Sequence, residues 1–210
     1  MMTERQQLVD GLAKMDLSLE EAIQDKLIHF LELMRKWNKV YNLTSRKDMD
    51  HMVARHLLDS LAVLPYLNGS RIIDVGTGAG LPSIPLALLC PEKNFVSLDC
   101  VTKKGRFRTQ AAIELGLTNM EVVTSRVEDY RPEVGFDSVI SRAFATIEDM
   151  LSGSGHLAAS DGTFLAMKGV YPESELSGIP SEYELEIVHS LHVPNLGAER
   201  HLAIIKRKTN

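Results

Sequence analysis

Three glycines on alternate positions follow an apolar run in the stretch IIDVGTGAGLPSIPLA, residues 72–87. Glycine has no Cβ, so Gly76, Gly78 and Gly80 allow positive φ angles and let a ligand approach the main chain closely. In an open α/β sheet, ligands bind beyond the carboxyl ends of the strands, where this loop is expected to lie. The stretch therefore predicts a nucleotide-like ligand cradled by bare main chain, with a tight turn alone as the simpler alternative.

The spacing of the glycines separates two classes of ligand. A dinucleotide fingerprint is GxGxxG, with a pyrophosphate on the helix N-terminus. Here the spacing is GxGxG, and Asp74 stands two residues before the first glycine. A carboxylate there suits the ammonium and sulfonium of S-adenosylmethionine better than a pyrophosphate. Asp99 ends the next expected strand and would accept ribose hydroxyls from either class, so we predict S-adenosylmethionine and keep NAD as the alternative.

The segment VISRAFAT, residues 139–146, bears on the methyl acceptor. Methylation of cytosine carbon-5 needs a covalent cysteine, and exocyclic amines are commonly handled by an Asn or Asp-Pro-Pro-aromatic loop. The segment contains neither. A ring nitrogen such as guanine N7 carries no proton to remove and needs neither. We assign no catalytic acid or base; Asp74 and Glu128 are carboxylates that could stabilise a cationic purine ring.

Strands and helices must alternate to position these residues. The expected strands are RIIDV, NFVSLD, MEVVT, FDSVI and GTFLAMK, with helices near residues 80–90, 103–115 and 146–157. That alternation predicts an α/β fold with a mostly parallel sheet covered by helices on both faces. The last two runs, 183–193 and 200–207, are joined by only PNLGAE, so they are expected to form an antiparallel C-terminal hairpin that completes seven strands.

The N-terminal third is expected to be helical. Ser18 and Glu21 have the spacing of a capping box, and residues 27–37 then repeat apolar side chains on one helix face. A second helix is expected over about 48–64, ending near Pro65.

Composition indicates one main domain with a sizeable core, since 44% of the 210 residues are hydrophobic and 24% are charged. We predict a helical extension, 1–68, packed on a methyltransferase domain, 69–210. No signal peptide or membrane span is recognisable, so we expect a cytoplasmic protein that does not associate with membranes. We also expect a monomer. Cys90 and Cys100 lack metal or redox spacing, and we expect reduced thiols and no metal.

The formal net charge of −5 argues at first against a nucleic-acid partner, but the basic residues are clustered. Residues 35–47 carry five basic side chains and no acidic one, and residues 101–110 carry four and none. A phosphate responds to the local cluster of positive charges and not to the net charge of the protein, so a local nucleic-acid-binding surface is possible. Ordinary solvent-exposed charged faces are the alternative. The candidate phosphate-binding residues are Lys36, Lys39, Arg46, Lys47, Arg55, Lys103, Lys104, Arg106 and Arg108.

Seven blocks of sequence resemble one known family. They are, in order, WNKVYNLTS, RHLLDSL, IDVGTGAGLPSIPLA, SRVEDY, FDSVISRAFA, AMKG and ERHLAIIK. They are similar to the bacterial 16S ribosomal RNA guanine-N7 methyltransferase family, RsmG or GidB. The resemblance implies a Rossmann-like class I methyltransferase fold and transfer of a methyl group from S-adenosylmethionine to one guanine N7 in 16S rRNA of the small ribosomal subunit. A different RNA or a small-molecule acceptor is the alternative.

The resemblance also implies that Gly76, Leu81, Val127, Glu128 and Arg142 contact the cofactor. At a strand end, Arg142 independently suits a carboxylate or phosphate. A surface ion pair of Arg142 with Glu148 or Asp149 is the alternative. The expected cofactor-binding residues are therefore Asp74, Gly76, Gly78, Gly80, Leu81, Asp99, Val127, Glu128 and Arg142.

Two positions depart from the family pattern. Ser83 stands where the family usually has glycine, which we expect to matter little beyond the loop. Gly105 interrupts the second basic cluster, where we expect it to weaken the start of a helix by about 1 kcal/mol. That departure leaves the role of Lys104 open.

Guanine N7 lies on the major-groove edge, which is too deep and narrow in A-form RNA for side chains to reach. The target is therefore expected in a loop or as an extruded base. Trp37, Tyr41 and Phe144 are candidates to stack on it, although core packing is the favoured role for Trp37. His56 has apolar neighbours and is expected to be a satisfied helix histidine, whereas His201 is left open.

Overall fold

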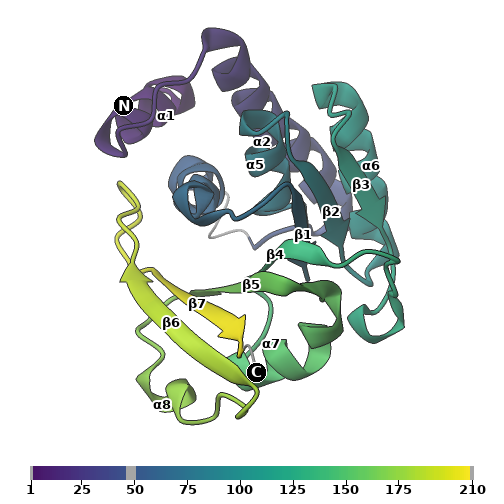
Figure 1. Cartoon of the computed structure of the whole chain (residues 1–210). Helices are drawn as coiled ribbons and strands as arrows, with labels where there is room; N and C mark the ends of the chain where they lie inside the picture. The colour runs from purple at the N-terminus through teal and green to yellow at the C-terminus, as the bar shows by residue number, and fades with distance from the viewer. Residues whose placement is uncertain (1, 46–50, 209–210) are drawn as a thin grey trace.

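The structure, a computed structural model, describes residues 2–45 and 51–208 and is built around a seven-stranded sheet (Figure 1). The strands are β1 (Arg71–Val75), β2 (Asn94–Leu98), β3 (Met120–Val123), β4 (Phe136–Ser141), β5 (Ala158–Lys168), β6 (Tyr183–Ser190) and β7 (His201–Arg207). Their order is β3-β2-β1-β4-β5-β7-β6, with β1 to β5 parallel and with β7 antiparallel to both β5 and β6. The predicted parallel sheet with an antiparallel C-terminal hairpin is confirmed.

The strand order reverses at β1, which pairs with β2 on one side and with β4 on the other. Asp74 lies beside Ser97 of β2 and Ile140 of β4 in this register. The crevice beyond the carboxyl ends of β1 and β4 is thus the place where open α/β sheets bind ligands. The glycine loop leaves β1 at this point.

Helices cover both faces of the sheet (Figure 1). The helical elements are α1 (Glu4–Lys14), α2 (Glu21–Tyr41), η1 (Val53–Leu58), α4 (Asp59–Leu61), η2 (Leu64–Tyr66), α5 (Ser83–Leu89), α6 (Thr102–Leu115), η3 (Val127–Asp129), α7 (Ile147–Ser154), η4 (Gly155–Leu157) and α8 (Glu173–Leu176). Successive strand residues point to opposite faces, so Ile72 joins the core under α2, α5 and α6 while Ile73 joins the core under α7.

The N-terminal helices share the core of the sheet. Leu8 and Leu27 are fully buried in the same cluster as Ile72. The rings of Phe30 in α2 and Phe107 in α6 stack with centroids 6.1 Å apart. The predicted helical extension is therefore packed against the rest of the chain, and its boundary at residue 68 stays a prediction.

The predicted capping box of Ser18 and Glu21 was wrong. The capping box belongs to α1, where Thr3 accepts from the Gln6 main chain and Gln6 accepts from the Thr3 main chain. Glu20, not Ser18, is the N-cap of α2, and it makes no side-chain cap hydrogen bond. The sequence carries S-x-x-E spacing there, but the helix starts later than that pattern requires.

The second predicted helix contains a π-helical stretch, η1, which continues into α4. Its expected first residues, 48–50, lie outside the described part of the chain. Apolar spacing predicts a helical face but does not distinguish i→i+4 from i→i+5 hydrogen bonding, and π-helical turns are frequent at functional sites. Among the helices of residues 2–45 and 51–208, none is both long enough and apolar enough to cross a lipid bilayer.

Candidate functional site

The glycine loop has positive φ at all three glycines, with values of 70° at Gly76, 61° at Gly78 and 88° at Gly80. A Cβ at Gly76 would lie 2.3 Å from the Cβ of Ala143, which follows β4. A Cβ at Gly80 would lie 2.4 Å from Ile84 of α5. At Gly78 the same test meets only a lysine ammonium at 3.7 Å. Two glycines therefore serve packing as well, and Gly78 is the one at which a Cβ would cause no clash.

Asp74 binds the glycine loop from its buried side through hydrogen bonds. Its Oδ2 accepts from the Thr77 hydroxyl at 2.5 Å and from the Ser83 main-chain N–H at 3.0 Å, and the two hydroxyls lie 2.9 Å apart. Asp74 is 1% exposed, and burial raises the pKa of its carboxyl while these hydrogen bonds oppose that shift. Asp74 thus orders the loop and does not line the cavity described below, and the Ser83 hydroxyl belongs to the same buried network.

Asp99 links the end of β2 to the glycine loop. Its Oδ2 accepts from the Gly78 N–H at 2.9 Å, and its Oδ1 accepts from the Val101 N–H at 2.8 Å. Each carboxylate oxygen has a second lone pair, and the residue is only half-buried. This position beside the loop is compatible with the ribose contact, which stays a prediction.

Arg108 does not hold phosphate, contrary to the prediction. It is 0% exposed, and its Nη1 and Nη2 donate to the main-chain oxygens of Gly78 at 2.9 Å and Val123 at 3.0 Å. Burial lowers the pKa of this guanidinium. Gly105 allows the close packing involved, because a Cβ there would lie 2.3 Å from the Thr124 hydroxyl. Gly105 is therefore needed where α6 packs closely against the Thr124 side chain, a role that the sequence analysis did not predict.

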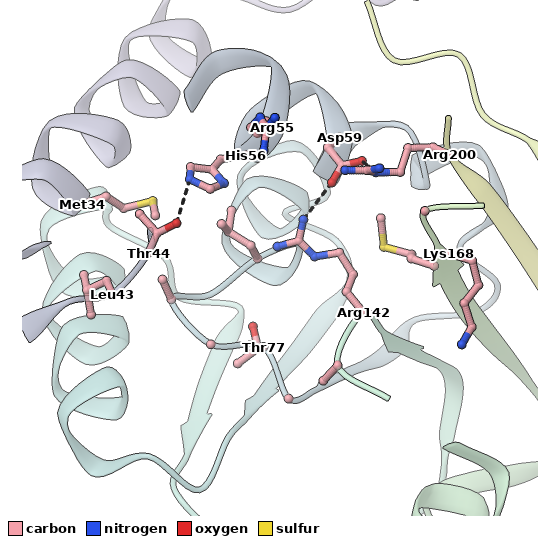
Figure 2. Close-up of a pocket in the computed structure, with 17 residues that line it drawn as sticks. Met34, Leu43, Thr44, Arg55, His56, Asp59, Thr77, Arg142, Lys168 and Arg200 are labelled. Atoms are coloured by element: carbon pink, nitrogen blue, oxygen red, sulfur yellow. Dashed lines mark hydrogen bonds and ion pairs between the residues drawn. The ribbon is translucent and has the colours of Figure 1, made fainter. Parts of the chain in front are cut away.

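A cavity of about 460 Å³ lies where the glycine loop leaves β1 (Figure 2). One part of its wall is the loop itself, through Gly76 and Gly78. Another part is the segment from η1 into α4, which contributes His56 and Asp59. Met34 of α2 belongs to the apolar part of the lining. The cavity thus joins the ligand loop to the N-terminal helices.

Asp59 holds two arginines on the wall of this cavity (Figure 2). Arg142 Nη1 donates to Asp59 Oδ2 at 2.9 Å, and Arg200 Nε donates to Asp59 Oδ1 at 2.7 Å. The predicted alternative partners of Arg142, Glu148 and Asp149, are not its partner. Asp59 and Arg200 were missed as site residues, although both lie in blocks that carry the family resemblance.

Lys168 lines the cavity, but its ammonium binds two groups that are not part of the lining. Its Nζ donates to the Ala145 main-chain oxygen at 3.0 Å and pairs with Glu175 at 2.8 Å. Glu175 also accepts from the Ile147 N–H at 2.8 Å, at the start of α7. In Figure 2 the ammonium points away from Arg142. Lys168 therefore fixes the segment after β4 from which Arg142 projects.

The structure brings together some of the predicted cofactor-binding residues. Gly76, Gly78, Leu81 and Arg142 line the cavity, whereas Asp74, Gly80, Asp99, Val127 and Glu128 lie outside its lining. Val127 packs against the core under α7, and Glu128 is exposed on η3. Cofactor contacts of these last residues stay predictions.

The predicted phosphate-binding residues have different surroundings. Lys36, Lys39, Lys103 and Arg106 are exposed, Arg55 lines the cavity, and Arg46 and Lys47 lie outside the described residues. The ammonium of Lys104 lies over Gly78, at the glycine loop.

The candidate stacking aromatics and the histidines also differ in their surroundings. Trp37 packs on Tyr41 at 5.2 Å and edge-on to Phe107 at 5.6 Å between ring centroids, so the favoured core role of Trp37 is confirmed. Phe144 is half-buried. His56 is 6% exposed, with Nε2 at 3.5 Å from the Thr44 hydroxyl, and it also lines the cavity.

Known families and proteins resemble this chain over most of its length. A family model described as rRNA small subunit methyltransferase G matches residues 23–203. The proteins named ribosomal RNA small subunit methyltransferase G from Marinobacter nauticus and Aeromonas hydrophila are 50% and 51% identical to it. The first match covers 96% of this chain and 94% of the relative, and the second covers 93% and 91%.

Solved structures share the fold at low identity. TrmN from Thermus thermophilus has a TM-score of 0.58 at 16% identity, covering 74% of this chain and 48% of that one. A SAM-dependent methyltransferase from Aquifex aeolicus has a TM-score of 0.58 at 17% identity, covering 80% and 97%. The predicted Rossmann-like methyltransferase fold is confirmed.

Proposed function

The chain belongs to the rRNA small subunit methyltransferase G family, and from that premise we propose that it methylates N7 of a single guanine in the 16S rRNA of the small ribosomal subunit. Its cofactor is S-adenosylmethionine, as family and fold indicate. The observation that carries the proposal is a single cavity that has both the bare glycine loop and arginine side chains on its wall.

The residues present fit the cofactor. Gly78 lines the cavity with main chain that carries no side chain, and Gly76 and Leu81 continue the same wall. Arg142 stands beside this loop, because the next residue, Ala143, packs on Gly76. Gly76, Gly78, Leu81 and Arg142 would hold the cofactor, which supplies a methyl group on a sulfonium.

The side chains around the cavity suit an acceptor that needs no deprotonation. Methyl transfer is an in-line displacement, so the protein mainly has to hold the nucleophile at attacking distance. Guanine N7 has a free lone pair and carries no proton. The carboxylate in the cavity, Asp59, is held by two arginines and is not placed as a free base.

The cysteines favour this acceptor over cytosine carbon-5. No cysteine belongs to the described lining of the cavity. Cys90 is buried at the end of α5, where burial raises the pKa of its thiol to about 11 and disfavours the nucleophilic thiolate. Cys100 is exposed beyond β2.

The test is methyl transfer from tritiated S-adenosylmethionine to small ribosomal subunits from cells that lack this methyltransferase. Recovered rRNA is then reduced with borohydride and cleaved with aniline, which breaks the strand at 7-methylguanosine. We expect label in 16S rRNA and one cleavage position. Label confined to another RNA or to small molecules, or label without cleavage, contradicts the proposal. A Gly78→Val protein is the control for transfer that does not depend on the glycine loop.

A further inference from the structure

One buried carboxylate joins three distant parts of the chain at the cavity wall. Asp59 begins α4, Arg142 follows β4 and lies 83 residues further on, and Arg200 precedes β7 and lies 141 residues away. The side chain of Asp59 is 2% exposed, and those of Arg142 and Arg200 are 28% and 24% exposed. The arrangement therefore depends on the folded sheet, and its two cations are partly withdrawn from water.

The charges in this cluster do not balance. Two guanidiniums share the Asp59 carboxylate, and the buried Asp74 interacts electrostatically with Arg142 but not with Arg200, so Arg200 is the less neutralised of the two. Lys168 is already paired with Glu175 and adds no free charge. A partly buried cation is costly unless an anion approaches it, so the cluster favours an anionic ligand.

Each arginine also has unused hydrogen-bond donors. A guanidinium has five N–H groups in a planar fork. Among residues 2–45 and 51–208, Arg142 donates only through Nη1, to Asp59, and Arg200 donates through Nε to Asp59 and through Nη1 to the Glu199 main chain at 2.9 Å. In the same part of the chain neither Nη2 group donates a hydrogen bond. Both side chains line the cavity, so these donors suit a phosphate.

The two arginines lie on different sides of Asp59 (Figure 2). Arg142 comes from the side of the glycine loop, where the next residue, Ala143, packs on Gly76, whereas Arg200 approaches from beyond Asp59. Arg142 is therefore on the side of the expected cofactor site, and the remaining donors of Arg200 are available to the RNA. We infer that Asp59 is a positioning residue that keeps Arg142 and Arg200 together and presents Arg200 to a backbone phosphate of the target RNA strand.

This inference rests on the proposed function, because the phosphate belongs to the RNA that carries the methyl acceptor. Without the carboxylate, the two like charges would repel each other and Arg200 would lose its orientation. Loss of Arg200 alone is expected to affect RNA binding more than cofactor binding, because Arg142 keeps its contact with Asp59.

The test is the salt dependence of binding to a single-stranded fragment of 16S rRNA. Each phosphate contact to a single strand contributes about 0.7 to the slope of log K against log salt. Arg200→Gln is expected to lower the slope by about 0.7 and the affinity by about tenfold. Asp59→Asn is expected to do the same, and the double variant no more, because both changes remove one contact.

The matched control is Asp137→Asn. Asp137 accepts from the Ser70 and Arg71 main chains at 2.7 and 2.9 Å, at the opposite end of β1. The substitution removes the same charge from a hydrogen-bonded carboxylate remote from the cavity. We expect an unchanged salt slope and an unchanged KM for RNA.

Kinetics and cofactor binding separate positioning from a general structural role. For Arg200→Gln we expect KM for RNA to rise about tenfold, with the Kd of S-adenosylhomocysteine changing less than about threefold, because Arg142 keeps its contact with Asp59. Asp59→Asn releases both arginines and is expected to weaken cofactor binding as well. Equal losses of RNA and cofactor binding in Arg200→Gln, with an unchanged salt slope, overturn the inference. So do additive effects of Asp59→Asn and Arg200→Gln.

Two further outcomes keep the inference and the proposed function apart. If Asp59→Asn does not fold, Arg200→Lys carries the test: a lysine keeps the charge but cannot bind Asp59 and a phosphate through one fork, so affinity falls while the slope is kept. Wild-type affinity in Arg200→Lys and Arg200→Gln overturns the inference. Absence of methyl transfer to any RNA by the wild type overturns the proposed function, and the inference falls with it.

Discussion

The guanidinium of Arg108 donates to the main-chain oxygen of Gly78 across 2.9 Å and so anchors the glycine loop from inside the protein. The same side chain reaches the Val123 oxygen at the end of β3. Arg108 thus connects α6, β3 and the loop after β1. Although Arg108 belongs to a run of basic residues, its role is to stabilise the glycine loop.

Replacing Arg108 with Met is expected to weaken both the fold and cofactor binding. Two charge-assisted hydrogen bonds are lost, so we expect the free energy of unfolding to fall by about 3 kcal/mol. The affinity for S-adenosylhomocysteine should fall at least about tenfold. Urea denaturation and titration calorimetry measure the two effects. A lower RNA salt slope with unchanged stability contradicts this role and restores the phosphate contact.

Ala at Gly105 is expected to destabilise the protein although Ala favours helices by about 1 kcal/mol. The new Cβ would meet the Thr124 hydroxyl at 2.3 Å, an overlap that costs about 2 kcal/mol or more. The double variant Gly105→Ala, Thr124→Ala removes that hydroxyl and should recover most of the loss. Thermal unfolding of the four proteins of this cycle measures the coupling, and additive effects contradict the explanation.

Ala at Gly78 and Ala at Gly76 are expected to fail for different reasons. Both impose a left-handed conformation on a residue with a Cβ, at a cost of about 1 kcal/mol. Gly76→Ala also collides with Ala143, so its unfolding free energy should fall by about 3 kcal/mol. Gly78→Ala should lose only the stability that the left-handed conformation costs, but its affinity for the cofactor should fall. Calorimetry with S-adenosylhomocysteine separates them, and full affinity in Gly78→Ala contradicts the cradle.

Asp74→Asn is expected to change how stability depends on pH. Burial raises the pKa of Asp74 above its ordinary value of 3.8, so the folded protein binds this proton more tightly than the unfolded chain. The stability from that proton is present below 3.8 and is lost as the pH rises through the folded pKa. The Asn variant keeps an acceptor for Thr77 and Ser83 without the charge. Its stability relative to wild type should therefore increase as the pH rises from 4 to 7, which urea denaturation measures at about four pH values; a constant difference contradicts it.

Charge reversal at Lys36 and Lys39 tests the exposed basic cluster. Both side chains lie exposed on α2, away from the buried core. Lys36→Glu with Lys39→Glu should weaken RNA binding strongly at low salt and little at high salt, because exposed charges are screened. Unchanged binding at low salt shows that this face is merely solvated.

The sequence by itself determined the elements and the loop. Strand periodicity and turn residues are local properties of the sequence. They therefore predicted the strand RIIDV, the glycine loop after it and the C-terminal hairpin. The family blocks were readable for the same reason. Positions such as Gly76 and Gly78 were recognised because a positive φ depends on the residue type itself.

The tertiary structure decided which charged residues meet. Nothing in the run KKGRFR distinguishes the exposed Arg106 from the buried Arg108, because that difference arises only when α6 packs on β3. Asp59 and Arg200 lie 141 residues apart, and no local pattern records their contact. Parallel strands bring their carboxyl ends to one edge of the sheet, and long-range packing alone selects the side chains that share it.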